Sequence, residues 1–339
     1  MSARRLAVLV LCHESLVPPP GTRGYDRRRP PEWRTEFDVA RALRALGHRV
    51  ELLGAQHDVH ALLAGVRAVR PDVVFNLLVE FHGRSAEDQH VASLLELVEL
   101  PYTGCGPRGL TLARDKALSK ELLAARGIDV PRFQVFARGA RVRRERGLAF
   151  PLLVKSRTEE ASLGIARASL VTDERALARR VAHVHERVGS DAIAEEYVDG
   201  RELYAGVLGP ATRPRVLPTW ELAFARLPAR VPRIATRAVK FSPATQRRLG
   251  VHSRAARLAP ALERRVARLA RTAWEALDLA GYARIDLRLS PAGRLVFLEA
   301  NPNPELARGE DFADAARAAG LAYPELVQTL LALARRRPR

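Results

Sequence analysis

The stretch ARIDLRLSPAGRLVFLEANPNPEL, residues 283–306, contains two apolar runs that are joined by a short segment with Pro291 and Gly293. This pattern predicts a β-hairpin, in which side chains alternate between the two faces of each strand. On that alternation one face carries Arg284, Asp286, Glu299 and Asn301, and the other carries Ile285, Leu287, Leu289, Val296 and Leu298. We therefore expect one face of the hairpin to join the core and the other to be charged.

The charged face has the composition of a magnesium site. If residues 290–293 form the turn, Arg284 opposes Glu299 and Asp286 opposes Phe297, which makes Asp286 and Glu299 diagonal neighbours about 7 Å apart. Two carboxylates and the Asn301 amide form an oxygen-only ligand set of the kind that Mg²⁺ prefers. The alternative is a half-exposed hairpin with ordinary solvent-facing charges. We favour the metal site because Glu299 and Asn301 end an apolar run.

The composition is strongly basic but does not by itself indicate a nucleic-acid partner. The chain has 339 residues and a formal net charge of +18, a length that suits two or three domains. The basic residues are spread along the chain, and the dense runs at 27–29, 138–146 and 335–339 are typical of solvated loops and a terminus. We expect no nucleic-acid partner.

Lysine is rare enough in this chain to be informative. Of 56 basic residues 52 are arginines, and the four lysines are Lys116, Lys120, Lys155 and Lys240. A compact, flexible ammonium group suits phosphate binding where a planar guanidinium does not. Lys155 ends a predicted strand and Lys116 begins a predicted helix, so both are candidates for phosphate contacts. The alternative is that these four positions are lysine by chance and have no role in phosphate binding.

Strands and helices alternate in the N-terminal third of the chain. Strands are predicted at 6–12, 49–54 and 71–78, and helices at 35–46, 59–69 and 87–98. Alternation of this kind indicates an open parallel sheet covered by helices. Residues 17–33 are rich in proline and glycine, which predicts a long loop.

The remaining two thirds predict an α+β arrangement. We expect a helix at 115–127 that ends at Gly127, strands at 150–156 and 165–171, a helix at 173–187, and two strands within 191–209 around a turn at Asp199 and Gly200. Helices are predicted at 260–280, 311–319 and 323–335, and residues 210–259 are not assigned.

Cysteine usage and hydropathy favour a cytoplasmic protein. Cys12 and Cys105 are the two cysteines and lie far apart, which fits a reducing compartment. No stretch approaches the roughly 20 apolar residues that cross a bilayer, so we expect no membrane partner. The oligomeric state is open, with a homodimer as one alternative.

Eight stretches, taken together and in order, resemble the ATP-grasp superfamily, and specifically its D-alanine-D-alanine ligase branch. They are HGRSAED (82–88), LPYTGCG (100–106), ARDKALSKELLAARGI (113–128), LLVKSRTEEASLGI (152–165), IAEEYVDGRE (193–202), ARIDLRL (283–289), FLEANPNP (297–304) and AGLAYPELVQTLL (319–331). The resemblance implies an α/β and α+β ATP-grasp fold with an N-terminal open, Rossmann-like parallel-sheet domain. We expect the domains to cover 1–110, 111–200 and 201–339.

The resemblance also implies roles for individual residues. ATP would be bound by Lys116, Lys155 and Ser162 of the loop 157–164, with Glu195, Glu196 and Val198 at the adenine and Glu202 at the ribose. Two Mg²⁺ ions, or Mn²⁺ in their place, would be held by Asp286, Glu299 and Asn301. The implied catalytic residues are Lys240 at the terminal phosphate, Arg284 at the transferring phosphoryl group, and His82 near the first substrate. A structural role for His82 is the alternative.

The implied activity is ATP-dependent ligation of a carboxylate to an amine through an acyl phosphate. The chain departs from the family pattern in the amino-acid pocket, where it has Glu160 and Ala161 in the loop, Phe241 after the late lysine, and Glu305 in place of a glycine. We therefore predict small amino-acid or carboxylate substrates other than two D-alanines. The added glutamates favour a substrate with an extra cationic group, or else belong to a loop surface.

Two other functions remain open on the sequence. One is a phosphotransferase that keeps the nucleotide site and acts on another small acceptor. The other is a basic nucleic-acid-binding protein with a retired ATP site. The combination of lysines, carboxylates and an amide argues against a retired site.

Overall fold

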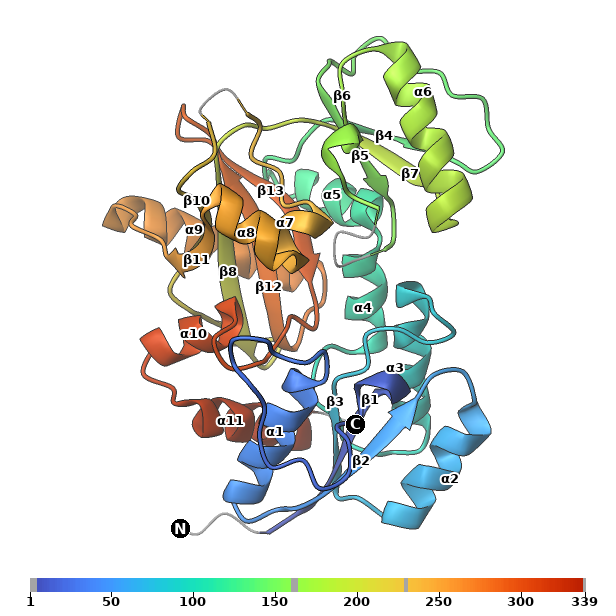
Figure 1. Cartoon of the computed structure of the whole chain (residues 1–339), viewed down its shortest axis with the longest axis vertical. Coiled ribbons are helices and arrows are strands. Elements are labelled where there is room, and N and C mark those ends of the chain that lie inside the picture. Colours follow the sequence, from blue (N-terminus) through green and yellow to red (C-terminus); the bar gives the residue numbers. More distant parts are fainter. Residues whose placement is uncertain (1–4, 160–163, 229–230, 338–339) are drawn as a thin grey trace.

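The computed structural model describes residues 5–159, 164–228 and 231–337, and these form three β-sheets with helices packed on them (Figure 1). The predicted residues Glu160, Ala161 and Ser162 lie outside the described ranges. The three sheets draw their strands from residues 7–76, 133–196 and 201–301. The division of the chain into domains at residues 110 and 200 stays a prediction.

The N-terminal sheet is parallel, as the alternating pattern predicted. It contains β1 (Ala7–His13), β2 (Arg49–Ala55) and β3 (Val73–Asn76) in the order β2-β1-β3. The accompanying helices are α1 (Arg34–Ala45), α2 (Val59–Val69) and α3 (Asp88–Leu97). Residues 8–12 of the central strand are fully buried, which explains their continuous apolar character.

A second, smaller sheet is antiparallel and has its own core. Its strands are β4 (Phe133–Phe136), β5 (Leu152–Ser156), β6 (Leu170–Val171) and β7 (Ala192–Glu196), in the order β4-β7-β5-β6. The helix α6 (Glu174–His183) packs on this sheet through Leu177 and Val181 and continues into a π-helical segment, Val184–Val188. The predicted strand at 165–171 is wrong over most of its length. Residues 167–169 form a 3-10 turn that the Ser169 hydroxyl caps, and only two residues pair with β5.

The third sheet is the largest and carries the hairpin. Its strands are β8 (Arg201–Gly209), β9 (Arg215–Val216), β10 (Trp220–Phe224), β11 (Val251–Ala255), β12 (Gly281–Leu289) and β13 (Leu295–Asn301). The order is β11-β10-β8-β12-β13, with β9 paired to β8. The helices of this part are α7 (Arg237–Phe241), α8 (Pro243–Leu249), α9 (Pro260–Ala276), α10 (Asp311–Ala318) and α11 (Tyr323–Arg335).

The two strands predicted within 191–209 form as β7 and β8, but they belong to different sheets. β7 pairs with β4 and β5, whereas β8 pairs with β10 and β12, so the chain crosses from one sheet to the other at Asp199 and Gly200. Gly200 has a φ of 139°, and a Cβ atom there would lie 2.0 Å from the Leu289 carbonyl oxygen. Glycine is required because the crossing chain passes so close to the end of β12.

Two short helices follow α3 in the chain and pack against the hairpin. They are α4 (Pro107–Arg114) and α5 (Lys116–Ala124), and both pack against β13. α5 begins after Asp115, whose Oδ1 accepts hydrogen bonds from the backbone amides of Ala117 and Leu118 at 3.1 Å. This cap fixes the position at which Lys116 enters the helix.

The hairpin forms where it was predicted, but its register differs. Asp286 pairs directly with Glu299, and Arg284 pairs with Asn301. The register shifts between Asp286 and Leu287, which opposes Phe297, so Leu298 is an extra, bulged residue. Phe297 is therefore the core residue, and Leu298 lines a pocket instead of the predicted core. The bulge returns Glu299 to the face of Asp286.

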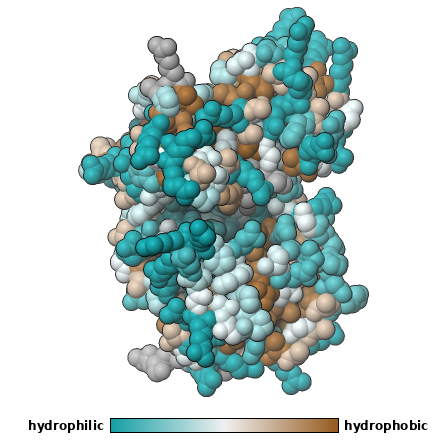
Figure 2. All heavy atoms as spheres, viewed as in Figure 1, coloured by the Kyte–Doolittle hydropathy of each residue, from teal (hydrophilic) through white to brown (hydrophobic). Residues whose placement is uncertain are grey.

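Hydrophilic side chains are spread over the whole visible face of the molecule (Figure 2). This matches the scattered basic residues of the sequence. None of the helices within the described ranges is both long and apolar enough to cross a membrane.

Candidate active site

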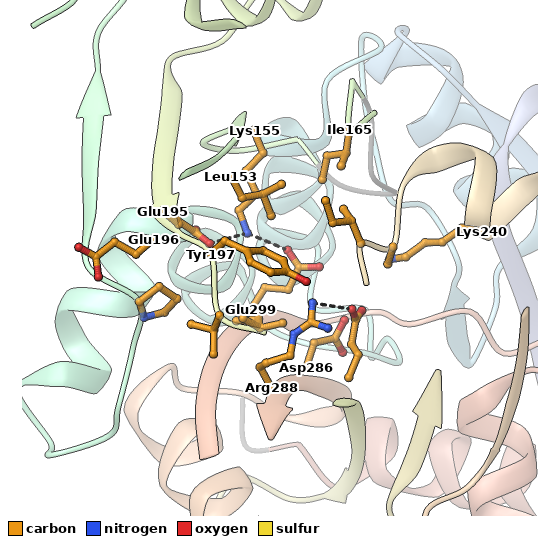
Figure 3. A pocket seen from close by; sticks show the side chains of 16 residues that line it. Leu153, Lys155, Ile165, Glu195, Glu196, Tyr197, Lys240, Asp286, Arg288 and Glu299 are labelled. Carbon is orange, nitrogen blue, oxygen red and sulfur yellow. Dashed lines mark ion pairs between the residues drawn. The ribbon is translucent and has the colours of Figure 1, made fainter. Parts of the chain in front are cut away.

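A pocket lies between the small sheet and the large sheet and encloses about 620 Å³, part of it open to solvent (Figure 3). Apolar residues and charged residues both contribute to its wall. The lining residues are Pro131, Leu153, Lys155, Ile165, Glu195, Glu196, Tyr197, Val198, Glu202, Ile234, Ala235, Lys240, Asp286, Arg288, Leu298 and Glu299. Eight of the predicted site residues, from both sheets and from α7, are therefore brought together here: Lys155, Glu195, Glu196, Val198, Glu202, Lys240, Asp286 and Glu299.

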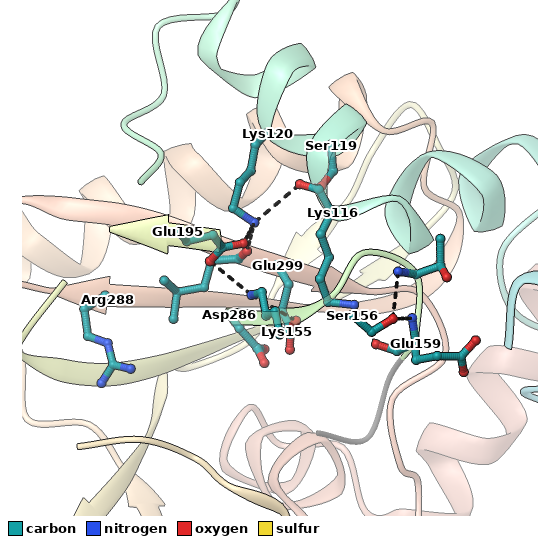
Figure 4. A network of polar contacts seen from close by, with 12 residues as sticks. Lys116, Ser119, Lys120, Lys155, Ser156, Glu159, Glu195, Asp286, Arg288 and Glu299 are labelled. Atoms are coloured by element: carbon teal, nitrogen blue, oxygen red, sulfur yellow. Dashed lines mark hydrogen bonds and ion pairs between the residues drawn. The ribbon is translucent and has the colours of Figure 1, made fainter. Parts of the chain in front are cut away.

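Lys155 and Glu195 form the charged centre of the small-sheet side (Figure 4). The Lys155 Nζ lies 3.1 Å from Glu195 Oε2 and 4.0 Å from Glu299 Oε2, so one ammonium group links the two sheets. Burial alone would raise the pKa of Glu195, but Lys120 and Lys155 outweigh it and lower that pKa. Burial would likewise lower the pKa of Lys155, but Glu195 and Glu299 raise it. Both groups are thus held in their charged forms.

Lys120 completes this network from α5. Its Nζ lies 2.8 Å from Glu195 Oε1 and donates to the Leu298 carbonyl at 2.6 Å. The β-bulge leaves that carbonyl outside the strand ladder, so the lysine satisfies an acceptor that the bulge creates. Lys120 is fully buried, and burial lowers its pKa.

Lys116 lies one helical turn before Lys120 on the same face of α5. Its Nζ donates to the Glu159 carbonyl at 2.7 Å, which ties the described start of the loop after β5 to the helix. The Arg157 guanidinium also pairs with the capping residue Asp115, with Nη2 and Oδ2 2.6 Å apart. Burial lowers the pKa of Lys116 to about 8.

Asp286 and Glu299 face each other across the two strands, and their charges are compensated from different sides. Arg284 binds Asp286 through two contacts, Nε to Oδ1 at 2.7 Å and Nη2 to Oδ2 at 2.8 Å. Burial nevertheless raises the pKa of Asp286, and the nearby Glu299 contributes to the rise. Burial would also raise the pKa of Glu299, but Lys155, Lys116 and other lysines lower it to about 2.

These residues fit a hard divalent cation. Asp286, Glu299 and the Asn301 amide can supply oxygen atoms from one face of β12 and β13. In the described ranges no group of three or more His, Cys, Asp or Glu side chains is placed to hold a metal ion. A cation here would therefore need further oxygen atoms from a ligand, such as phosphate oxygens.

The residues predicted from the family resemblance to contact adenine and ribose all line the pocket. Glu196 accepts a hydrogen bond from the Ala149 backbone amide at 2.8 Å, and Val198 follows it by two residues. Glu202 is nine-tenths buried and is already paired, with Arg288 Nη2 at 3.0 Å and the Tyr204 hydroxyl at 2.9 Å. Glu202 thus already has a cation and a hydroxyl group as partners in the ligand-free protein.

His82 lies apart from these residues. It does not line the pocket, and its ring nitrogens contact Glu87 Oε2 at 2.8 Å and the His57 carbonyl at 2.9 Å. Arg284 and Asn301 also lie outside the pocket lining but are paired with each other in the hairpin. The catalytic role of His82 stays a prediction, as do the other residue roles.

Three residues of this site were missed in the sequence. Lys120 had a visible signal, because it is one of four lysines and follows Lys116 by one helical turn. Arg288 follows Asp286 by two residues and so belongs to the same strand face. Tyr197 has no comparable signal, because its place in the wall depends on how the two sheets meet (Figure 3).

Comparison with known proteins identifies the family. A family model described as D-ala D-ala ligase C-terminus matches residues 122–332. The D-alanine--D-alanine ligase of Desulforudis audaxviator (strain MP104C) is 33% identical over 304 residues, which cover 88% of this chain and 92% of the relative. The chain belongs to the D-alanine-D-alanine ligase family. The enzymes of this family are ATP-grasp ligases that form carbon-nitrogen bonds.

Solved structures of D-alanine-D-alanine ligases share the fold. The enzyme from Bacillus anthracis, complexed with ATP, aligns with a TM-score of 0.76 at 19% identity, covering 98% of each chain. The VanG D-Ala:D-Ser ligase from Enterococcus faecalis aligns with a TM-score of 0.69 at 19% identity, covering 98% of this chain and all of the other. The predicted ATP-grasp fold with an N-terminal parallel sheet is thus confirmed.

Proposed function

We propose that this chain is an ATP-dependent carboxylate-amine ligase, which forms an amide bond through an acyl phosphate and uses Mg²⁺. The observation that carries the proposal is the pairing of Asp286 with Glu299 beneath the ammonium group of Lys155. The relatives' names and the ATP bound to the Bacillus anthracis enzyme agree with it. Such a site offers oxygen ligands to a cation and a positive charge to the phosphates beside it.

The side chains on the nucleotide side would act mainly by position. Lys155 is fixed by two carboxylates, and Lys116 by the Glu159 carbonyl, so both ammonium groups are held in place before a phosphate arrives. Asp286, Glu299 and Asn301 would hold Mg²⁺, which would supply positive charge to offset that of the phosphates. Leu153, Ile165 and Leu298 supply an apolar wall against which a planar base can pack.

Arg284 would stabilise negative charge at the reacting centre. Its guanidinium is held by Asp286 and lies 4.4 Å from the centre of the Tyr204 ring. A cation that is fixed in this way needs no reorganisation when charge develops on the phosphoryl group or on the tetrahedral adduct. The carboxylate substrate would therefore meet the terminal phosphate of ATP beside the Arg284 guanidinium.

We propose further that the substrates are small amino acids or carboxylates other than two D-alanines. Relatives of 31–33% identity are named D-alanine--D-alanine ligase, whereas VanG is a D-Ala:D-Ser ligase on the same fold. Glu305 lies in the loop after β13, and Phe241 follows Lys240, with 57% of the Phe241 surface exposed. Both positions depart from the family pattern, and these departures support a changed pocket.

The test measures release of ADP and phosphate in the presence of ATP, Mg²⁺ and a panel of amino acids, each as both enantiomers. The products would then be identified by mass spectrometry. We expect turnover that needs Mg²⁺ and an amino acid, and a product joined by an amide bond. Hydroxylamine should divert the acyl phosphate to a hydroxamate. Phosphorylation of an acceptor without amide formation would instead indicate a phosphotransferase. Turnover with D-alanine as the only amino acid would contradict the proposal that the substrates are other than two D-alanines.

A further inference from the structure

Tyr204 is a buried residue of the large sheet, next to two residues of the pocket wall. It belongs to β8, where it pairs with Trp220 of β10 on one side and with Asp286 of β12 on the other. Only 3% of Tyr204 is exposed, and its side chain belongs to the core cluster that also contains Trp220 and Phe312. Residues that pair directly share a face of the sheet, so Tyr204 lies on the face of Asp286 and Glu202.

The hydroxyl group of Tyr204 reaches the predicted ribose contact. It donates to Glu202 Oε1 at 2.9 Å, and Arg288 Nη2 lies 3.0 Å from the other carboxylate oxygen (Figure 3). Burial and the Glu202 charge raise the pKa of Tyr204 well above its ordinary value, so the hydroxyl group keeps its proton and remains a donor. The two contacts orient the Glu202 carboxylate, and each of its oxygen atoms can still accept a hydrogen bond from a ribose hydroxyl.

The ring of Tyr204 supports the arginine of the reacting centre. The Arg284 Cζ lies 4.4 Å from the ring centroid, which is a cation–π contact. The same guanidinium donates to both Asp286 oxygens, at 2.7 and 2.8 Å. The carboxylate holds the edge of the guanidinium and the ring holds its face, so its orientation is set before charge develops beside it.

One side chain therefore contacts a residue predicted at the nucleotide and another predicted at the transferring phosphoryl group. Tyr204 is not among the described residues that line the pocket, so it would act through these two residues. We propose that Tyr204 is a positioning residue of the ligase site, which holds Glu202 through its hydroxyl group and Arg284 through its ring. This proposal rests on the proposed ligase function and adds a residue to that same site.

The first variant, Tyr204→Phe, removes the hydroxyl group and keeps the ring. Release of ADP would be measured at varied ATP with Mg²⁺ and each amino acid that stimulates the unchanged protein. We expect the KM for ATP to rise about fivefold, because Glu202 loses a donor, and kcat to stay within about twofold. In a protein that carries Glu202→Ala, the same change at Tyr204 should add nothing to the KM for ATP, because the hydroxyl group acts through Glu202.

The second variant, Tyr204→Met, also removes the ring and keeps a long apolar side chain in the core. We expect the same rise in the KM for ATP together with a fall in kcat of about tenfold, because Arg284 loses the contact with its face. A tyrosine with only a structural role would not divide its effects between KM and kcat in this way. If Tyr204→Met does not fold, Tyr204→Phe in the presence and absence of Glu202→Ala still decides the proposal.

The control is Tyr102, which has the same kinds of partner in the N-terminal part of the chain. It is 2% exposed, its hydroxyl group donates to Glu96 Oε1 at 2.6 Å, and the Arg337 Cζ lies 4.5 Å from its ring centroid. Tyr102→Phe and Tyr102→Met should leave kcat and the KM for ATP unchanged.

Two results would overturn the positioning role of Tyr204 and leave the ligase function standing. One is an unchanged kcat and KM for ATP in both Tyr204 variants, and the other is an equal change in the Tyr102 variants. If no amino acid stimulates ADP release by the unchanged protein, the ligase function fails, and the role of Tyr204 fails with it.

Discussion

Two groups of buried carboxylates lie on either side of Arg284, and they differ in how their charge is compensated. Next to the pocket, Glu195 and Glu299 are surrounded by Lys116, Lys120 and Lys155, and the pKa values of both carboxylates are lowered. Where the start of α1 meets the loop after β13, burial prevails and the pKa values of Glu36 and Glu310 rise to about 7. Both pairs of carboxylates are removed from solvent, so the number of nearby cations decides whether each carboxylate stays charged.

This difference separates what the protein supplies from what a ligand must supply. The carboxylates beside the pocket are already paired with lysines, so the pocket can bind an anion such as a phosphate together with a metal ion. Glu36 and Glu310 have only the Arg34 guanidinium as a nearby cation at the start of α1, and its charge does not offset their burial. Removing charges from each side should therefore have opposite effects on the stability of the ligand-free protein.

The largest effect is expected from Lys120→Met. This change leaves Glu195 with one cation and the Leu298 carbonyl without a donor, and it should lower the free energy of unfolding by about 3–5 kcal/mol. Denaturant unfolding measures it, with the added change Glu195→Gln expected to recover part of the loss. Lys240→Met, which alters a less buried lysine, should stay within about 0.5 kcal/mol of the unchanged protein. Equal losses for the two lysines would contradict the comparison.

Glu299→Gln should affect turnover rather than folding. The substitution keeps the shape but removes a charge that faces Asp286, so Mg²⁺-dependent ADP release should fall about 10²–10³-fold. The protein should still fold, but its melting temperature at neutral pH should be lower, because the surrounding lysines stabilise the charged form of Glu299. Unaltered turnover would remove Glu299 from the metal site.

Glu36→Gln should change stability only at neutral and alkaline pH. Because the folded-state pKa of about 7 lies above the ordinary value of 4.5, the protonated glutamate stabilises the fold below about pH 4.5. That contribution is lost as the pH rises through 7. The amide does not titrate, so the variant should be more stable than the unchanged protein at pH 8, by at most about 3 kcal/mol, and similar at pH 4.5. Melting curves at the two pH values would show this, and a variant that is less stable at pH 8 would contradict it.

The smallest effect is expected for the pH dependence of ATP binding at Lys116. With a pKa of about 8, its ammonium group loses its proton in the ligand-free protein as the pH rises above 8. ATP affinity should then fall about fivefold between pH 8 and pH 9. Lys116→Met should bind ATP more weakly and without this pH dependence, as calorimetric titration can measure. The same pH dependence in both proteins would assign it to another group.

The sequence predicted the parts of the fold that local patterns control. The parallel N-terminal sheet follows from continuous apolar runs between amphipathic helices, and the shared face of Asp286 and Glu299 follows from strand alternation. The β-bulge at Leu298 was not predictable, because it depends on Lys120 binding the freed carbonyl from another element. The crossing at Gly200 was missed for a related reason, since its cause is the close approach of β12.

The site shows the same division. Lys155, Asp286 and Glu299 lie together as predicted, because each occupies a defined place on a strand. Glu36 was not identified, since the contact between α1 and the loop after β13 joins segments that are more than 260 residues apart. No local pattern could indicate that contact.

The central claim is that the face shared by Asp286 and Glu299 holds a metal ion together with ATP. The most direct test is calorimetric titration of the unchanged protein with a non-hydrolysable ATP analogue, with Mg²⁺ present and with Mg²⁺ removed by a chelator. We predict tight binding with Mg²⁺ and at least about tenfold weaker binding without it. Equal binding under the two conditions, or no binding under either, would contradict the claim.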